Sequence, residues 1–291
     1  MKRPDKILWV VAGAMVLSAG SGATAIGSQE RPTLTKDKQQ QQSQQQSGTT
    51  LSLDAPSVAP ASSEEDTAVK ALQAMPEAST ANLQLKLQAA EGFLQKYPQS
   101  RYRPMVYAFL ATGYIQIGQA DKGVAFGDKE IDLNPNDVQM MAIISQTIPR
   151  SLNPSAPDAG TKLDKAEMYG KKAVEVLPTI PKPEGMSDEV FLSTKNQTLA
   201  IAHSGLGLVS WRRGKYADAI PELEQSLKLD PVADPVNWFI LGVVDQNTSH
   251  FDDATFAFGK CASIPGKLQD TCKTRSEEAK KLAATKLSVP K

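Results

Sequence analysis

The chain has 291 residues, of which 41% are apolar, so it is long enough to bury a sizeable hydrophobic core. Lysine and arginine total 32, as do aspartate and glutamate, and the formal net charge is therefore zero. This balance argues against a polyanionic partner such as nucleic acid or an anionic lipid surface.

The first 25 residues have the three-part pattern of an export signal. A basic start precedes an uncharged apolar run at residues 7–19, and small residues then lead to an Ala-Thr-Ala cleavage site that ends at Ala25. We therefore predict a signal peptide at residues 1–25. No charge interrupts residues 7–28, so the alternative is an uncleaved anchor that tethers the chain to the membrane. Either interpretation places the rest of the chain in the periplasm or another extracytoplasmic compartment of the cell envelope.

Residues 26–66 have the composition of a solvated linker. The stretch 39–46 is nearly pure glutamine, and its flanks are rich in Ser, Thr, Pro and Lys. Such a segment buries too little apolar surface to offset the entropy lost on ordering. We therefore predict a disordered tether that precedes the folded domain.

Two segments near the C-terminus share a spaced set of small, aromatic and proline residues. In residues 200–233 the set is Leu206, Gly207, Gly214, Tyr216, Ala219, Leu223 and Pro231, and in residues 235–266 it is Trp238, Leu241, Gly242, Phe251, Ala254 and Phe258. Both sets resemble the tetratricopeptide repeat (TPR), in which two helices form a hairpin that packs on its neighbours.

The resemblance extends more weakly to three earlier segments, about 67–100, 104–137 and 138–180. In the second of these, Gly123 and Gly127 stand where an alanine and an aromatic residue are usual, so we expect its second helix to pack loosely. In the third, we expect a loop at residues 149–160, which are rich in proline and serine.

A final amphipathic helix at residues 268–287 would cap the last repeat with a polar outer face. The resemblance thus implies an all-α TPR solenoid of about four to five repeats over residues 67–287.

Cys261 and Cys272 are the two cysteines of the chain. In the repeat pattern they lie at facing ends of the last repeat and the capping helix, with a Pro-Gly turn between them. Antiparallel helices flanking that turn bring such side chains together, and export permits oxidation, so we predict a disulfide. Buried free thiols, or a redox-active pair, are the alternatives.

Little in the sequence indicates catalysis. The two histidines, His203 and His250, are too few for most metal or Ser-His-Asp sites, and no phosphate-binding, dinucleotide-binding or haem-attachment motif is present. We expect neither an enzyme nor a cofactor.

By position, the resemblance places the first helix of each repeat on a concave face that binds a segment of a partner protein. The partner-binding residues that it implies are Ile115, Gln116, Leu208, Trp211, Arg212, Phe239, Val243, Gln246 and Asn247. The Lys and Asn residues by which chaperone-adaptor TPRs hold a C-terminal carboxylate are replaced at the matching positions by Ala108, Thr112, Ile201 and Gly205. Chaperone-tail recognition is therefore not expected.

The first-helix residues have a second interpretation, since they could pack against the capping helix or the tether. The function predicted is a non-enzymatic protein-interaction scaffold in the cell envelope. The alternatives are an enzyme, or the regulatory subunit of one, that acts on envelope substrates, and a self-assembling structural repeat protein.

Overall fold

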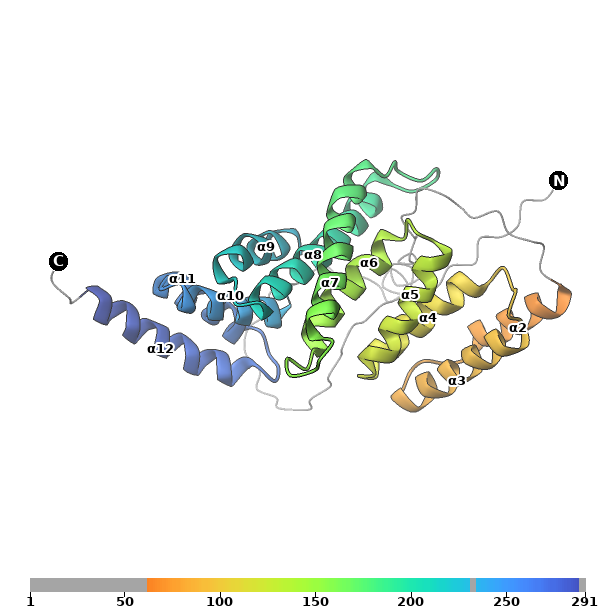
Figure 1. Ribbon diagram of the computed structural model, residues 1–291, viewed down its shortest axis with the longest axis horizontal. Helices are drawn as coiled ribbons and strands as arrows, with labels where there is room; N and C mark the ends of the chain where they lie inside the picture. The colour runs from red at the N-terminus through yellow and green to blue at the C-terminus, as the bar shows by residue number, and fades with distance from the viewer. Residues whose placement is uncertain (1–61, 231–233, 288–291) are drawn as a thin grey trace, which may run out of the picture. The chain divides into compact units, whose positions relative to one another are not determined.

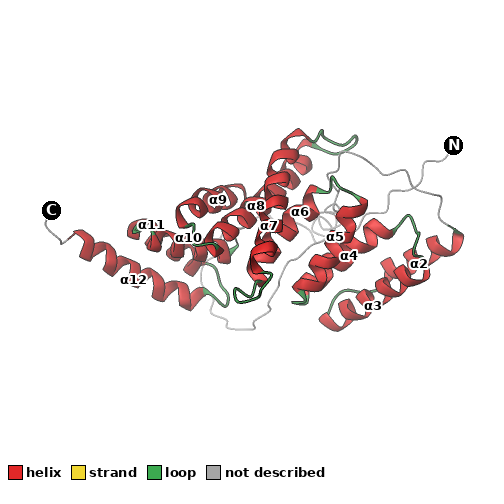
Figure 2. Cartoon of the chain, viewed as in Figure 1, coloured by secondary structure: helices red, strands yellow, loops and turns green. Residues whose placement is uncertain are grey.

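The computed structural model describes residues 62–230 and 234–287 of the chain. Every regular element in these ranges is a helix (Figure 2). The predicted signal peptide and nearly all of the predicted linker lie outside the described residues. The elements are α2 (Ser63–Ala74), α3 (Thr80–Lys96), α4 (Arg103–Gln116), α5 (Ala120–Leu133), α6 (Val138–Ser151), α7 (Ala159–Val176), the short 3₁₀ helix η1 (Leu177–Thr179), α8 (Asp188–Arg212), α9 (Tyr216–Leu229), α10 (Pro235–Asn247), α11 (Phe251–Ser263) and α12 (Gln269–Leu287).

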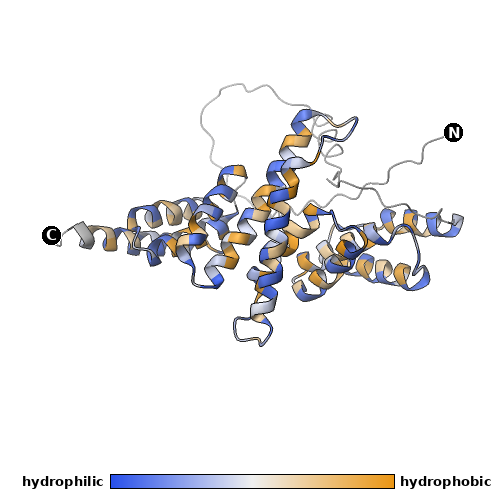
Figure 3. Cartoon of the chain, turned by 45° about the horizontal axis from the view of Figure 1, so that its top comes forward, coloured by the Kyte–Doolittle hydropathy of each residue, from blue (hydrophilic) through white to orange (hydrophobic). Residues whose placement is uncertain are grey.

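Consecutive helices pack in pairs, and the pairs pack on one another in chain order (Figure 1). α4 packs on α5, α6 on α7, α8 on α9 and α10 on α11, while α6 also contacts α8, and α11 contacts α12. Apolar and polar residues occur together along the helices (Figure 3), as is typical of helices with one buried side. The predicted fold class, an all-α solenoid of helical hairpins, is confirmed.

Glycines form the tight turns within two of the hairpins. Gly118 joins α4 to α5 with φ 80°, and Gly214 joins α8 to α9 with φ 71°. This left-handed conformation costs glycine little because glycine has no Cβ. The corresponding turn between α10 and α11 uses Ser249 at φ 63°.

Two further glycines let the helices of a hairpin approach closely. A Cβ at Gly207 in α8 would lie 2.7 Å from Cγ of Leu223 in α9, and a Cβ at Gly242 in α10 would lie 2.7 Å from Cδ1 of Phe258 in α11. Both distances are shorter than an ordinary carbon–carbon contact. The repeat signature therefore has a direct packing cause, because a larger residue would push the helices apart.

The expectation that the second helix of 104–137 packs loosely is wrong. A Cβ at Gly123 in α5 would lie 2.6 Å from Cγ1 of Ile115, and one at Gly127 would lie 2.8 Å from Cδ1 of Ile144. Both glycines are buried. Their lack of side chains brings α5 close to α4 and α6 rather than leaving space.

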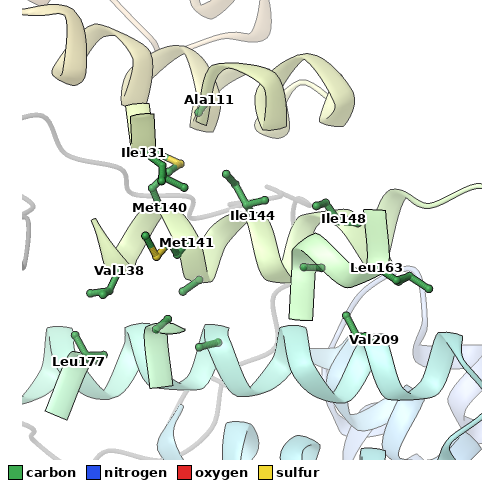
Figure 4. Close-up of a cluster of buried hydrophobic side chains, with 14 of the residues drawn as sticks. Ala111, Ile131, Val138, Met140, Met141, Ile144, Ile148, Leu163, Leu177 and Val209 are labelled. Atoms are coloured by element: carbon green, nitrogen blue, oxygen red, sulfur yellow. The ribbon is translucent and has the colours of Figure 1, made fainter. Parts of the chain in front are cut away.

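The largest buried cluster is centred on α6 (Figure 4). Its α6 side chains point toward α4 and α5 on one side and toward α7 and α8 on the other. The α6 members include Val138, Met140, Met141, Ile144 and Ile148. Since so little of α6 faces solvent, it is the structural centre of the first half of the domain. A second cluster joins α8, α9 and α10, and a small third cluster joins α11 and α12.

Three predicted boundaries are corrected by the structure. The expected loop at 149–160 is shorter, because α6 continues through Pro149 to Ser151 and α7 begins at Ala159. Pro149 lies in the last turn of α6; it has no amide N–H to donate to the carbonyl of Ser145, and the helix ends two residues later. The predicted linker extended to residue 66, whereas α2 begins at Ser63 after the cap of Ser62.

The third correction concerns α8, which begins twelve residues before the predicted repeat, at Asp188 rather than at residue 200. The Ser187 hydroxyl accepts a hydrogen bond from the Val190 amide at 3.3 Å, which satisfies an amide at the helix start. Asp188 and Glu189 lie in the first turn, where their negative charges interact favourably with the positive end of the helix dipole.

Candidate functional site

Six of the predicted partner-binding residues lie on α8 and α10: two adjacent residues at the end of α8 and four along one side of α10. Residues three or four positions apart share a helix face, and the α10 members follow this spacing while the two α8 members end their helix. All six are partly or fully exposed. We call this set the α8–α10 surface; it consists of Trp211, Arg212, Phe239, Val243, Gln246 and Asn247.

Trp211 and Arg212 form a stacked pair at the end of α8. The Arg212 guanidinium carbon lies 4.5 Å from the centre of the Trp211 ring, within the range of a cation–π contact. Arg212 Nε donates a hydrogen bond to the carbonyl oxygen of Pro149 at 2.8 Å. Burial lowers the pKa of Arg212 from its usual value, so the charged side chain is partly removed from water.

The backbone beneath this pair is held by a polar network that spans several helices. Arg150 of α6 pairs with the Asp234 carboxylate at 2.7 Å, and its Nη2 donates to Asn237 Oδ1 at 3.1 Å. Ser204 of α8 donates to the same oxygen at 2.8 Å, and Asn237 donates to Ser226 Oγ of α9 at 3.2 Å. Because its members come from four neighbouring helices, the network fixes how α6, α8, α9 and α10 sit together.

Phe239 and Val243 connect the α8–α10 surface to the C-terminal core. Both pack against the cluster of Ala254, Phe258 and Ala279, and the ring centres of Phe239 and Phe258 are 5.8 Å apart. Both are nevertheless only partly buried. One side of each residue therefore packs toward the capping helix, as the second interpretation of these residues expected, and part of each residue is exposed.

Gln246 and Asn247 end α10. Asn247 is exposed, and its side-chain amide donates to the Val243 carbonyl oxygen at 2.8 Å. Gln246 Oε1 is buried and has no hydrogen-bond partner in the structure. A buried acceptor without a hydrogen-bond donor lowers the free energy of unfolding.

Three predicted residues do not belong to this surface. Leu208 is only 1% exposed and lies in the core between α8, α9 and α10, so its assignment to the binding face is corrected. Its neighbour on the helix, Gly207, brings α9 too close for Leu208 to remain open. Ile115 packs toward Gly123 of α5, and Gln116 is exposed at the end of α4. α4 has no extensive packing with α8 or α10, so these two residues are not brought to the others.

The structure joins Cys261 of α11 to Cys272 of α12, as predicted. Their Cα atoms are 5.8 Å apart, and both side chains are fully buried. The bond therefore fixes the start of the capping helix to the last hairpin.

Neither histidine is placed as a metal ligand. His203 Nδ1 lies 2.7 Å from Glu222 Oε2, while His250 Nδ1 lies 3.1 Å from the Thr248 hydroxyl. In residues 62–230 and 234–287, no group of three or more His, Cys, Asp or Glu side chains is arranged to hold a metal ion. Within the same ranges, no helix has the length and apolar character needed to span a bilayer.

The sequence did not indicate one feature, a cavity of about 380 Å³ between α7, α8 and α9. Val174, Leu206 and Val209 supply its apolar wall, and Glu167 and Glu222 lie among its polar lining. Both carboxylates already have partners, since Glu167 pairs with Lys171 and Arg213, and Glu222 contacts His203. Only the three-dimensional packing of three helices creates this space, so no local motif could have predicted it.

Comparison with known proteins gave matches among solved structures alone. No family model matches the chain, and no curated protein matches it. The chain is similar to a thermophilic TPR protein, TTC0263 of Thermus thermophilus, with 17% identity, coverage of 74% of this chain and 98% of that one, and a TM-score of 0.45. It is also similar to MamA, from residue 41 to its end, of Desulfovibrio magneticus RS-1, with 15% identity, coverage of 77% and 97%, and a TM-score of 0.41. A third similar structure is Acl4, an assembly chaperone of RpL4, with 9% identity, coverage of 76% and 99%, and a TM-score of 0.41.

The hairpins of the described chain keep the spacing that resembled the TPR in the sequence. Glycines occupy the helix crossings of α8 with α9 and of α10 with α11, and paired helices stack in chain order. The described chain is thus a solenoid of helical hairpins.

Proposed function

We propose that the chain is a non-enzymatic scaffold whose α8–α10 surface binds a segment of a partner protein. The observation that carries this proposal is the Trp211–Arg212 pair, a partly exposed aromatic ring stacked by a partly desolvated cation. Tryptophan and arginine are the residue types most often found at the energetic centre of protein interfaces. The Arg150 network holds the backbone beneath them, so a partner would meet a surface that is already ordered.

The partner segment we expect is a short helix or strand with apolar side chains. Phe239 and Val243 offer partly exposed apolar side chains on α10, where Phe239 packs against the same core cluster as Trp211, and Asn247 adds an exposed amide at the end of α10. Apolar strips flanked by polar groups are the usual receptors of such segments.

Site-specific photo-cross-linking in intact cells tests this proposal. A photoreactive residue at the exposed position Asn247 should form an adduct with another protein, whereas one at Met168, which is 55% exposed on α7, should not. The mass of the adduct identifies the partner. Cross-linking at Met168 alone, or at neither position, would contradict the proposal. An adduct between two copies of the chain would favour the self-assembling alternative.

The cellular location belongs to the same proposal and rests on the sequence alone. The basic start, apolar run and Ala-Thr-Ala site predict export with cleavage after Ala25. Intact-mass analysis of the protein from the cell envelope should therefore give an N-terminus near Ile26. A full-length species extracted only with detergent would instead establish the membrane anchor, and a full-length species in the cytoplasm would refute export.

A further inference from the structure

Arg212 has no acidic partner, in contrast to four of the five other arginines of the described chain; the fifth, Arg103, also has none. Arg101, Arg150, Arg213 and Arg275 each lie within ion-pair distance of an Asp or Glu side chain. No carboxylate in residues 62–230 and 234–287 forms such a pair with Arg212. Its charge is partly removed from water without compensation by an acid.

The Arg212 guanidinium is nevertheless held in one orientation. Its Nε donates to the Pro149 carbonyl oxygen at 2.8 Å, and its face lies on the Trp211 ring at 4.5 Å. Neither terminal nitrogen has a hydrogen bond within the described chain, and neither is sealed from solvent. The two nitrogens that match a carboxylate fork are therefore positioned and open.

A purely structural role accounts for only part of this arrangement. Pro149 lies in the last turn of α6, whose terminal carbonyl groups lack intrahelical partners and carry partial negative charge. Arg212 Nε satisfies one of these carbonyl groups. A single donor is enough for that role, and the terminal nitrogens remain available.

We propose that Arg212 receives the carboxylate of an aspartate or glutamate side chain in the partner segment, bound in a forked pair beside Trp211. This inference rests on the proposed function, because it names the chemistry of the partner at the α8–α10 surface. An acidic side chain supplies the counter-charge that Arg212 lacks, and apolar residues of the same segment can contact Phe239 and Val243 on α10. The partner segment is therefore apolar with an acidic residue at a fixed position.

Peptide selection followed by a double-mutant cycle tests the inference. Binders are selected from a random-peptide display library on the purified full chain, and those that lose binding to the Trp211→Ala or Phe239→Ala variant are kept. We expect the retained peptides to share one Asp or Glu. Replacing that residue by Asn or Gln should weaken binding to the wild-type chain roughly tenfold to a hundredfold. The same replacement should weaken binding to Arg212→Gln by less than about twofold, because the acid then has no partner to lose.

Arg213→Gln is the matched control, since Arg213 is the adjacent arginine but already pairs with Asp164 and Glu167. This variant should retain the full dependence on the peptide acid. Melting curves of Arg212→Gln establish that the variant is folded. Binding of wild type should also fall as salt is raised, since ion pairs are screened.

The outcomes separate the two proposals. Peptides that need Trp211 and Phe239 but share no acid, or whose acid is not coupled to Arg212, would overturn the Arg212 assignment and leave the proposed surface intact. Loss of binding when only the peptide C-terminus is amidated would overturn the assignment of a side-chain acid. If no selected peptide depends on Trp211 or Phe239, the proposed function itself fails.

Discussion

Glu130 and Asp137 form a buried pair of carboxyl groups where α5 meets α6. Glu130 is 2% exposed and Asp137 is 4% exposed. Burial, followed by the charge of Asp137, raises the pKa of Glu130 to about 9. Burial also raises the pKa of Asp137, but its carboxylate accepts a hydrogen bond from the Met140 amide at 2.9 Å, which favours its charged form. We therefore infer that Glu130 carries the shared proton.

This pair makes stability depend on pH in a defined direction. The pKa of Glu130 is higher in the folded state than in the unfolded state, where it is about 4.3. Its contribution to stability is thus fully present below about pH 4 and is lost as the pH rises through about 9. Asp245, whose pKa burial raises to about 7, acts in the same direction over a lower range.

Glu130→Gln should remove one part of this dependence. The amide cannot ionise, so the free energy of unfolding of the variant relative to wild type should rise with pH between 5 and 9, by up to about 1.4 kcal/mol per pH unit. Denaturant unfolding at a series of pH values measures this difference. Asp245 is present in both proteins, so its contribution cancels in the difference. Glu175→Gln, at an exposed position on α7, is the control and should follow wild type. Parallel profiles for Glu130→Gln and wild type would refute the protonated pair.

Two glycines in the last hairpin should respond to alanine in opposite ways. Gly242 faces the Phe258 ring, so Gly242→Ala should destabilise the fold by about 1–3 kcal/mol as the ring is forced to move. Gly259 in α11 has open space at its Cβ position, so Gly259→Ala should stabilise by up to about 1 kcal/mol through helix propensity. Denaturant unfolding of both variants checks the pair. Equal effects would show that the glycine of the repeat signature is not set by helix contact.

The capping helix α12 packs along α11 and is joined to it by one covalent bond. Its buried residues Cys272, Ser276 and Ala279 face α11, and Ser276 Oγ donates to the Thr255 carbonyl oxygen at 3.2 Å. The cluster that it shares with α11 is small. The disulfide therefore adds a covalent tie to this packing at the start of the helix.

Replacing Cys261 and Cys272 together by alanine should lower the free energy of unfolding by about 3 kcal/mol, which is the chain-entropy value for a closed loop of this length. A longer loop would give a larger loss. The loss should be local to the C-terminal end, since hairpins in a solenoid contact only their neighbours. Hydrogen exchange followed by mass spectrometry should show faster exchange in α12 and unchanged exchange in α6. A uniform increase along the chain would contradict this picture of the capping helix.

Helix types and pairing could be predicted from sequence, while several boundaries could not. The repeat signature depends on local spacing, so Gly207 and Gly242 indicated their hairpins correctly. The early start of α8 follows from the Ser187 cap, which lies outside any repeat pattern. The close packing of Gly123 depends on how tightly α4 approaches α5, and composition alone suggested the opposite.

At the scale of the whole domain, the exposure of the proposed binding residues was predictable only in outline. Position within the repeat identified the exposed stripe of Trp211 and Arg212, but it also included Leu208, which α9 covers. The Arg150 network joins residues that are distant in sequence, such as Ser204 and Asn237. Such contacts form only when hairpins stack, so no single-sequence pattern reports them.

A matched pair of tryptophan variants tests whether the α8–α10 surface binds a partner protein. Trp211 and Trp238 are both partly buried, and both pack against the core cluster of α8, α9 and α10. Trp238 is not a member of the α8–α10 surface and makes an edge contact with Phe256 of α11 at 6.0 Å between ring centres. Truncation of either ring should therefore lower the melting temperature. A loss of stability then occurs in both variants and does not account for a difference in binding between them.

The direct measurement is the Kd of the cross-linked partner, once purified, for wild type, Trp211→Ala and Trp238→Ala. Trp211→Ala should weaken binding by about 2 kcal/mol or more, roughly thirtyfold, because it removes an interface anchor. Trp238→Ala should leave the Kd within about twofold of wild type, well inside 1 kcal/mol. Equal affinities for the two variants, or a larger loss for Trp238→Ala, would contradict the assignment of partner binding to the α8–α10 surface.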